Sequence, residues 1–277
     1  MPDETTATHR PHAGDALPPA LAELLSGLEE GDDRRAAAAF SADAIYASPT
    51  AEDHEVAPRT VAAAGEIRPV LAADPLLGNR HAIRVCCVAG TDCLVEGLVH
   101  DRSGDPIRSF AASLQLDPSG QISRCLLFRV PVVEDAGRAG APNDAGTDIR
   151  RALDEYFEDL QANRFEAATS NYSDDCLYSH PPYPPGTRRV EFRGRAGLLA
   201  GFEGRGAQPV RIYIDRSIQH NTDLMLEGHA FSDGTPEGPQ SSFLSSATVD
   251  AAGKIRRYVA FQCKGWEHRR DSGGGDS

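Results

Sequence analysis

The chain has 277 residues, of which 40% are hydrophobic and 25% charged, so it is long enough to bury one large core or two small ones. Its formal net charge is −13 and its 28 Lys and Arg residues form no dense patch, which excludes nucleic acid and an anionic membrane surface as expected partners. No apolar run approaches the roughly 20 residues of a membrane-spanning helix, and the polar, acidic N-terminus does not resemble a secretory signal, so we expect a cytoplasmic protein.

The chain begins with a polar stretch, residues 1–16, which we expect to be a disordered tail. The first domain, residues 17–134, is identified by its repetition later in the chain. FSADAIYASPT (40–50) aligns with YSDDCLYSHPP (172–182), TDCLVEG (91–97) with TDLMLEG (222–228), and FAASLQLDPSGQISRCLLF (110–128) with FLSSATVDAAGKIRRYVAF (243–261). The shifts are 132, 131 and 133 residues, and such small differences indicate insertions and deletions in loops.

A linker of small and polar residues, DAGRAGAPNDAGT (135–147), follows the first domain. The second domain spans residues 148–266, and a polar tail, 267–277, closes the chain. A short linker raises the effective concentration of the two domains to about the millimolar range, so we expect them to associate as an intramolecular pseudo-dimer. Association of several chains into a homo-oligomer stays open.

The expected elements of the second domain follow one another as helices and then strands. Apolar residues at helical spacing predict a helix that begins near Ile149 and includes Tyr156. A short helix over 165–172 and a third over 196–202 come next, and strand-like runs follow at 210–218, 224–231, 242–249 and 255–263. This order predicts an α+β fold with two tandem cone-shaped domains, each with about three N-terminal helices packed on a curved antiparallel sheet.

The six cysteines lie mostly inside apolar runs, without a C-x-x-C pair or a histidine at the spacing of metal ligands. We expect them to be reduced core residues. The sequence also contains no phosphate-binding loop, dinucleotide-binding glycine pattern or nucleophile elbow. We therefore expect neither a metal nor an organic cofactor.

Three features together resemble the nuclear transport factor 2-like superfamily, which includes the ketosteroid isomerases and the SnoaL-like polyketide cyclases. They are an opening amphipathic helix followed by a short one, the segment YSDDCLYSHP (172–181), and a closing hairpin around D-x-x-G-K-I. The resemblance covers most of both halves and implies the cone-shaped fold. Because this fold hosts isomerases, dehydratases, cyclases, epoxide hydrolases and noncatalytic members, the resemblance points only weakly to one reaction.

The resemblance implies roles for several residues of the second domain. Tyr156 takes the place of a tyrosine that donates a hydrogen bond to an oxyanion, and His180 takes that of an aspartate general base before a proline. Ser245 falls near a protonated aspartate of the family but cannot be a strong acid donor. We expect Ser245, Phe202 and Tyr183 to contact the substrate.

A second group of candidates lies on the strand predicted at 224–231. Met225, Glu227 and His229 are on one face of it, because alternate residues of a strand share a face. If that face lines the cone, we expect Glu227 and His229 either to form a second acid–base pair or to orient His180, and Met225 to contact the substrate. The alternative is that Glu227 and His229 are only solvated polar residues on the surface of the sheet.

The repeat allows the two halves to be compared residue by residue. The first half has Leu24 in place of Tyr156, Ser48 in place of His180, Ala51 in place of Tyr183, Leu98 in place of His229 and Ala112 in place of Ser245. Residues present in both copies, such as Tyr46 with Tyr178 and Glu96 with Glu227, more plausibly serve the fold. We therefore expect the site in the second domain.

The expected chemistry is enolisation of a small, largely apolar carbonyl compound of polyketide-like or terpenoid-like character. A neutral histidine takes a proton, and a phenol stabilises the enolate in a site of low dielectric. The outcome is isomerisation, loss of water or ring closure, as in a SnoaL-like cyclase, dehydratase or isomerase. The alternative is a noncatalytic protein of the same fold that binds a small ligand or acts as a scaffold. The bias toward Ala, Arg, Gly and Asp is compatible with a bacterial source.

Overall fold

The computed structural model describes residues 17–49, 57–133, 149–183, 188–232 and 241–266. The expected tails, 1–16 and 267–277, and the expected linker, 135–147, lie outside these residues, so they stay predictions. Within the described part of the chain, no helix is long and apolar enough to cross a membrane.

The described residues form two units with the same order of elements. The first contains α1 (Pro19–Glu30), α2 (Asp33–Ala38), β1 (Phe40–Ser48), β2 (Arg59–Ala62), α3 (Ala64–Ala72), β3 (Arg80–Ala89), β4 (Asp92–His100), β5 (Pro106–Leu116) and β6 (Ile122–Val130). The second contains α4 (Ile149–Gln161), α5 (Phe165–Ser170), β7 (Tyr172–His180), β8 (Val190–Arg193), α6 (Arg195–Arg205), β9 (Val210–His220), β10 (Asp223–Ser232), β11 (Ser241–Val249) and β12 (Ile255–Lys264). The tandem α+β architecture expected from the repeat is therefore confirmed.

Each unit has a six-stranded sheet, in the order β2-β1-β6-β5-β4-β3 and β8-β7-β12-β11-β10-β9. The sheets are mixed and not wholly antiparallel as expected, because β1 pairs with β6 and β7 pairs with β12 in parallel. The long intervening chain provides the crossover that a parallel pair needs. Tyr172 begins β7, although the sequence placed it at the end of the preceding short helix.

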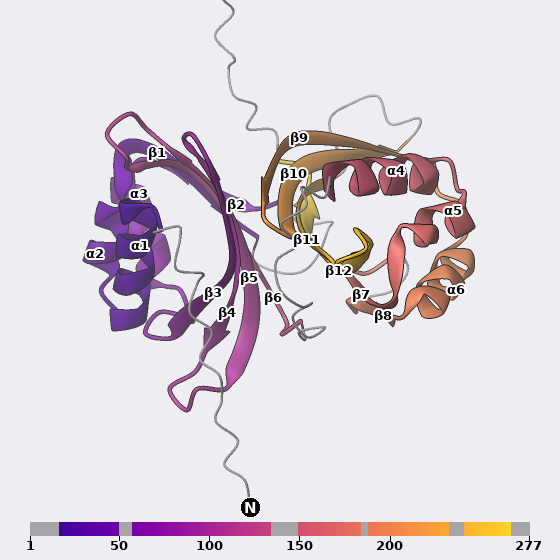
Figure 1. Ribbon diagram of the computed structural model, residues 1–277. Coiled ribbons are helices and arrows are strands. Elements are labelled where there is room, and N and C mark those ends of the chain that lie inside the picture. The colour runs from indigo at the N-terminus through magenta and orange to yellow at the C-terminus, as the bar shows by residue number, and fades with distance from the viewer. Residues whose placement is uncertain (1–16, 50–56, 134–148, 184–187, 233–240, 267–277) are drawn as a thin grey trace, which may run out of the picture.

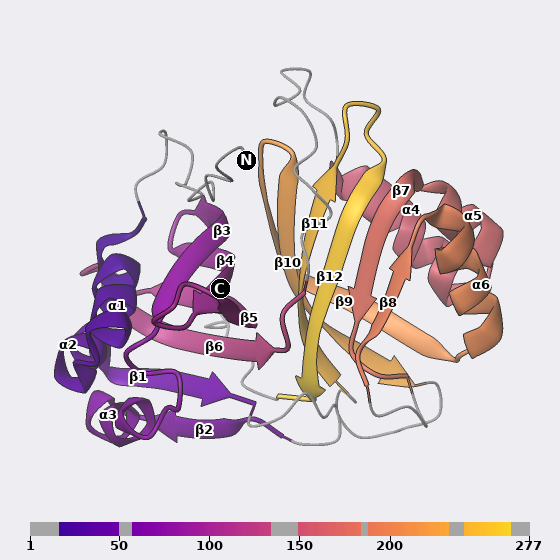
Figure 2. The same ribbon diagram turned by 90° about the horizontal axis from the view of Figure 1, so that it is seen from below.

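The two sheets face each other in the centre of the molecule, and the helices lie on the outer sides (Figures 1 and 2). Alternation along the strands decides which side chains reach which layer. Leu94 of β4 and Met225 of β10 belong to a hydrophobic cluster shared by the two sheets, whereas Val95 and Leu226 belong to the separate cores on the helix sides. The two units therefore form the intramolecular pseudo-dimer that the repeat predicted.

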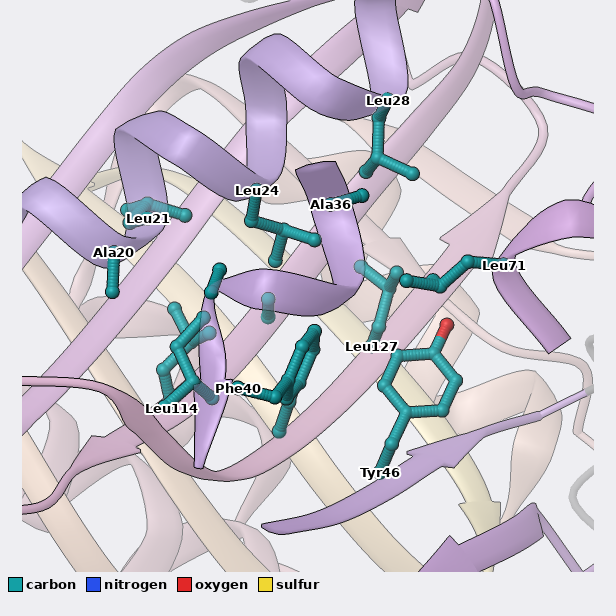
Figure 3. Packing of buried hydrophobic residues seen from close by; sticks show 14 of the residues in the cluster. Ala20, Leu21, Leu24, Leu28, Ala36, Phe40, Tyr46, Leu71, Leu114 and Leu127 are labelled. Atoms are coloured by element: carbon teal, nitrogen blue, oxygen red, sulfur yellow. The ribbon is translucent and has the colours of Figure 1, made fainter. Parts of the chain in front are cut away.

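Aliphatic side chains fill the cone of the first unit. Leu21, Leu24 and Leu28 point from α1 toward the strands, where Phe40 and Tyr46 belong to the same cluster (Figure 3). Each of these leucines is at most 4% exposed, as expected for a helix with apolar residues at spacings of three and four. This cone is a conventional apolar core with one phenol in it.

Candidate functional site

The cone of the second unit is lined with tyrosines. The cluster of buried residues on its helix side includes Tyr156 from α4, Tyr172 and Tyr178 from β7, and Tyr258 from β12. All four are at most 3% exposed. At the corresponding positions the first unit has Leu24, Phe40, Tyr46 and Cys125. The two units thus share a backbone plan but differ in the polarity of their cone.

His180 stands at the end of β7, next to this cluster, and is half-buried. Its Nδ1 lies 2.8 Å from the carbonyl oxygen of Pro181. Because a carbonyl only accepts hydrogen bonds, Nδ1 carries the proton, and Nε2 is the basic nitrogen of the neutral ring. The backbone therefore selects the tautomer of His180.

The imidazole of His180 is stacked on tyrosine rings. Its centroid is 4.7 Å from that of Tyr183 with an interplanar angle of 19°, and 5.9 Å from that of Tyr178 with an angle of 2°. The hydroxyl groups of Tyr178 and Tyr183 are 2.7 Å apart and share a hydrogen bond. His180 thus lies against a hydrogen-bonded pair of phenols.

One further ring, that of Tyr258, connects Tyr178 to Tyr156. The ring of Tyr258 is nearly parallel to that of Tyr178, with centroids 5.4 Å apart, and lies 5.8 Å from the ring of Tyr156. The hydroxyl groups of Tyr258 and Ser245 are 2.9 Å apart. The structure therefore places His180, Tyr183, Ser245 and Tyr156 around one aromatic cluster, to which Phe202 also belongs.

The phenols of this cluster are neutral at physiological pH. Burial raises the pKa of Tyr156 well above its usual value of 10, and the nearby phenols of Tyr172 and Tyr258 add to the effect. Burial raises the pKa of Tyr178 and Tyr258 in the same direction. Neutral phenols donate hydrogen bonds without losing a proton, so this cluster can stabilise an oxyanion but does not supply a phenolate base.

Tyr172 contributes a buried hydroxyl that makes no hydrogen bond to any residue the structure describes. Its side chain is 1% exposed, and its ring packs edge-on against Tyr156 with centroids 5.2 Å apart. A buried donor without a partner costs about 1–3 kcal/mol, so such groups in native proteins call for an explanation. A polar group of a bound molecule is one way to satisfy this hydroxyl.

Arg205, the last residue of α6, lies beside the cluster. Its guanidinium carbon is 5.1 Å from the ring centroid of Tyr183, 5.3 Å from that of Phe202 and 5.7 Å from that of Phe165. These distances are within the range of cation–π contacts. A positive charge is thus held among three aromatic rings next to the phenol that stacks on His180.

The face of β10 that carries Met225, Glu227 and His229 does not line the cone. Met225 lies in the cluster between the two sheets, and Glu227 forms ion pairs with Arg124 of the first unit, 2.5 Å away, and with Arg216. Burial opposes the charged form of Glu227, but these two arginines outweigh it and hold its pKa at about 2. Glu227, expected as an acid–base residue, and Met225, expected as a substrate contact, therefore lie at the contact between the two units.

His229 belongs to the same interdomain face. Its Nδ1 forms an ion pair with Asp215, and its Nε2 lies 3.4 Å from the carbonyl oxygen of Trp266. Burial lowers the pKa of His229, but the hydrogen bond with Asp215 and the charge of that carboxylate outweigh burial and leave the pKa above 6.5. Both ring nitrogens of His229 thus face oxygen acceptors at the interdomain face, apart from the aromatic cluster beside His180.

The residue comparison between the halves contains signals for the site residues that the sequence analysis missed. Tyr258 has Cys125 as its counterpart, Tyr172 has Phe40, and Arg205 has Ala73. Tyr178 has a tyrosine counterpart, Tyr46, so its contact with His180 and Tyr183 could not be found in this way. Among the residues that the structure describes, no group of three or more His, Cys, Asp and Glu side chains could hold a metal ion.

No protein-family model and no curated protein matches the chain. Solved structures do match parts of it. An NTF2-like protein from Burkholderia xenovorans is 20% identical, with 44% of this chain and 88% of that chain covered and a TM-score of 0.34. A LEH-like epoxide hydrolase from M. tuberculosis is 18% identical over 41% of this chain and 81% of its own, with a TM-score of 0.33.

A third structure, from Agrobacterium tumefaciens, is named as a SnoaL-like family protein; it is 16% identical over 40% of this chain and 94% of its own, with a TM-score of 0.32. Each match covers a share of this chain close to that of one unit. Two of these three structures carry the names NTF2-like and SnoaL-like.

Proposed function

We propose that the second unit is a cofactor-independent lyase, isomerase or cyclase that transfers protons on a small, largely apolar carbonyl compound. The observation that carries this proposal is the stacking of His180 on the hydrogen-bonded pair of Tyr178 and Tyr183. A base with a fixed tautomer and a set of neutral phenol donors are the two components that enolisation needs.

In this mechanism, Nε2 of His180 takes a proton from the carbon next to the substrate carbonyl. The electron pair of that C–H bond moves toward the carbonyl oxygen, which becomes an enolate. Phenol hydroxyl groups, with Tyr183 the nearest to His180, donate hydrogen bonds to the enolate oxygen. The imidazolium then returns the proton to another carbon or to a leaving hydroxyl group, which gives isomerisation or loss of water. For ring closure, the enolate carbon attacks a second carbonyl carbon of the substrate, the electron pair of that C=O bond moves to its oxygen, and this oxygen takes the proton from the imidazolium.

The charge states of the side chains decide which of them acts as the base and which of them donate hydrogen bonds. Burial raises the pKa of Tyr183, although the hydrogen bond from Tyr178 and the charge of Arg205 partly oppose this rise. The phenols are therefore donors, and His180 is the base. The first unit lacks this combination, because Ser48 stands where the second unit has His180.

A noncatalytic role is the second candidate, and the tight packing of the rings favours it. Tyr156 contacts four aromatic neighbours at centroid distances of 5.0–6.4 Å and is 1% exposed, as an ordinary core tyrosine would be. In this reading the second unit binds a small ligand at the edge of the cluster, or the tyrosines only stabilise the fold.

Proton exchange separates these two functions without knowledge of the natural substrate. The full chain is incubated in D₂O with a panel of cyclic and aryl ketones, and loss of the α-protons is followed by NMR. We expect the wild-type chain to accelerate exchange and His180→Ala to slow it about 10²–10⁴-fold, the usual contribution of a general base.

The control is His220→Ala, which removes a histidine from the end of β9 and leaves the cluster intact. It is expected to exchange at the wild-type rate, and both variants are expected to keep the wild-type thermal unfolding midpoint within a few degrees. Exchange at the background rate with the wild-type chain, or unchanged exchange in His180→Ala, would favour the noncatalytic role.

A further inference from the structure

Arg205 has no carboxylate beside it among the residues that the structure describes, unlike several other arginines of the second unit. Arg150 is paired with Asp154, Arg164 with Asp159, and Arg195 with Asp174. No such acidic partner of Arg205 occurs among the residues that the structure describes, and its Nε is buried without a hydrogen bond. The guanidinium thus keeps one donor, the Nε–H group, that no described residue uses, while it also interacts with the hydroxyl of Tyr183.

The surroundings of Arg205 hold the guanidinium in place. The rings of Tyr183, Phe202 and Phe165 provide cation–π contacts at 5.1–5.7 Å. Arg205 is partly buried and its Nε is buried, and a planar guanidinium is suited to bind a carboxylate through two parallel hydrogen bonds. The position is also specific to this unit, because its counterpart in the first unit is Ala73.

We infer that Arg205 is an anion-binding residue of the second unit and that its ligand is an apolar compound bearing a carboxylate group. Tyr183 contacts both Arg205 and His180. A carboxylate bound at Arg205 therefore leaves the apolar part of the same molecule against the tyrosine cluster, with its reacting carbon directed to His180. The inference rests on the proposed function, since it names the substrate class of that site.

Binding measurements test this inference independently of turnover. Titration calorimetry on the full chain uses matched pairs of probes, an aryl- or cycloalkyl-substituted propionic acid and its neutral amide, at pH 7. The wild-type chain is expected to bind at least one acid about tenfold or more tightly than the corresponding amide, as for a charge-assisted bidentate hydrogen bond. Arg205→Gln is expected to remove the preference and Arg205→Lys to keep part of it, since lysine retains the charge but not the planar fork.

Arg195→Gln is the matched control, because Arg195 begins the same helix and forms an ion pair with Asp174 at the surface. It is expected to keep the wild-type preference. The inference is overturned if the wild-type chain binds no acid at millimolar concentration, if it binds acids and amides equally, or if Arg205→Gln retains the preference.

The binding and proton-exchange measurements together, with His180→Ala as the variant in the exchange assay, distinguish this inference from the proposed function. A chain that prefers acids but never accelerates proton exchange contradicts the catalytic proposal and leaves the anion site intact. A chain that accelerates exchange in a His180-dependent way but shows no preference for acids contradicts only the assignment of Arg205.

Discussion

Glu96 of the first unit and Arg257 of the second form a two-point ion pair between the facing sheets. One of its hydrogen bonds, from Arg257 Nη1 to Glu96 Oε2, is 2.8 Å long, and Glu96 is 0% exposed. The repeat places Glu227 and Arg124 at the equivalent positions, and these two residues are paired in the opposite direction across the same interface. The interface is thus nearly symmetric, as in a dimer of identical subunits.

Removing one charge from this interface should destabilise the whole chain. Glu96→Gln keeps the size of the side chain but leaves Arg257 buried without its counter-charge, which costs about 3–5 kcal/mol of unfolding free energy. Urea unfolding followed by circular dichroism measures this loss. Glu23→Gln is the control, because Glu23 pairs with Arg35 on the surface, and its midpoint should not change. Equal midpoints for both variants would show that the buried pair does not hold the sheets together.

The same carboxylates predict a loss of stability in acid. Burial alone would raise the pKa of Glu96 and Glu227, but their arginine partners outweigh it and hold both values at about 2, against 4.5 for an exposed glutamate. The folded pKa is the lower one, so the stabilisation is complete above about pH 4.5 and disappears as the pH falls toward 2. Urea midpoints measured between pH 7 and pH 3 should fall steeply below pH 4.5. Glu96→Gln should show a shallower fall; an identical fall would assign the acid sensitivity to other groups.

Removing one hydroxyl group of the hydrogen bond between Ser245 and Tyr258 should destabilise the chain more than removing both hydroxyl groups. Tyr258→Phe leaves the Ser245 hydroxyl buried without its partner and should cost about 1–3 kcal/mol, whereas the double variant with Ser245→Ala removes both polar groups and should recover part of that loss. Thermal or urea unfolding of the two single variants and the double variant gives the coupling. Strictly additive effects would mean that the two hydroxyl groups do not depend on each other.

Two glycines of the second unit should respond in opposite directions to alanine. A Cβ at Gly228 of β10 would lie 2.1 Å from the carbonyl oxygen of Tyr213 and 2.8 Å from the ring of Phe243, so Gly228→Ala should destabilise by about 1–3 kcal/mol or more. A Cβ at Gly197 of α6 meets no atom within 4 Å, so Gly197→Ala should stabilise by about 0.4–1 kcal/mol through higher helix propensity and a less flexible unfolded chain. Unfolding midpoints that move in the same direction would contradict this account.

The repeat in the sequence was sufficient to predict two α+β units, but only four of the six strands of the second unit. Periodicity and the common shift between the halves predicted the strands of β9 to β12 to within a few residues, because the alternation of apolar side chains along a strand is a local property. The family resemblance indicated Tyr156 and His180, and the different residues Leu24 and Ser48 in the first half favoured the second unit as the place of the site. The parallel pairing of β7 with β12 was missed, because it joins segments that are far apart in the chain.

The sequence by itself determined two α+β units, the polar residues unique to the second of them and the order of their elements, since each depends on local pattern or on repetition. Only the tertiary structure decided which face of β10 meets the other unit, and hence that Glu227 pairs with Arg124 and does not face the cone as an acid–base partner of His229. It also decided that Tyr178 and Tyr183 share a hydrogen bond next to His180 and that Arg205 lies among three rings. Alternation gives two faces to a strand, but only the packing of one sheet on another says which of them is buried against which neighbour.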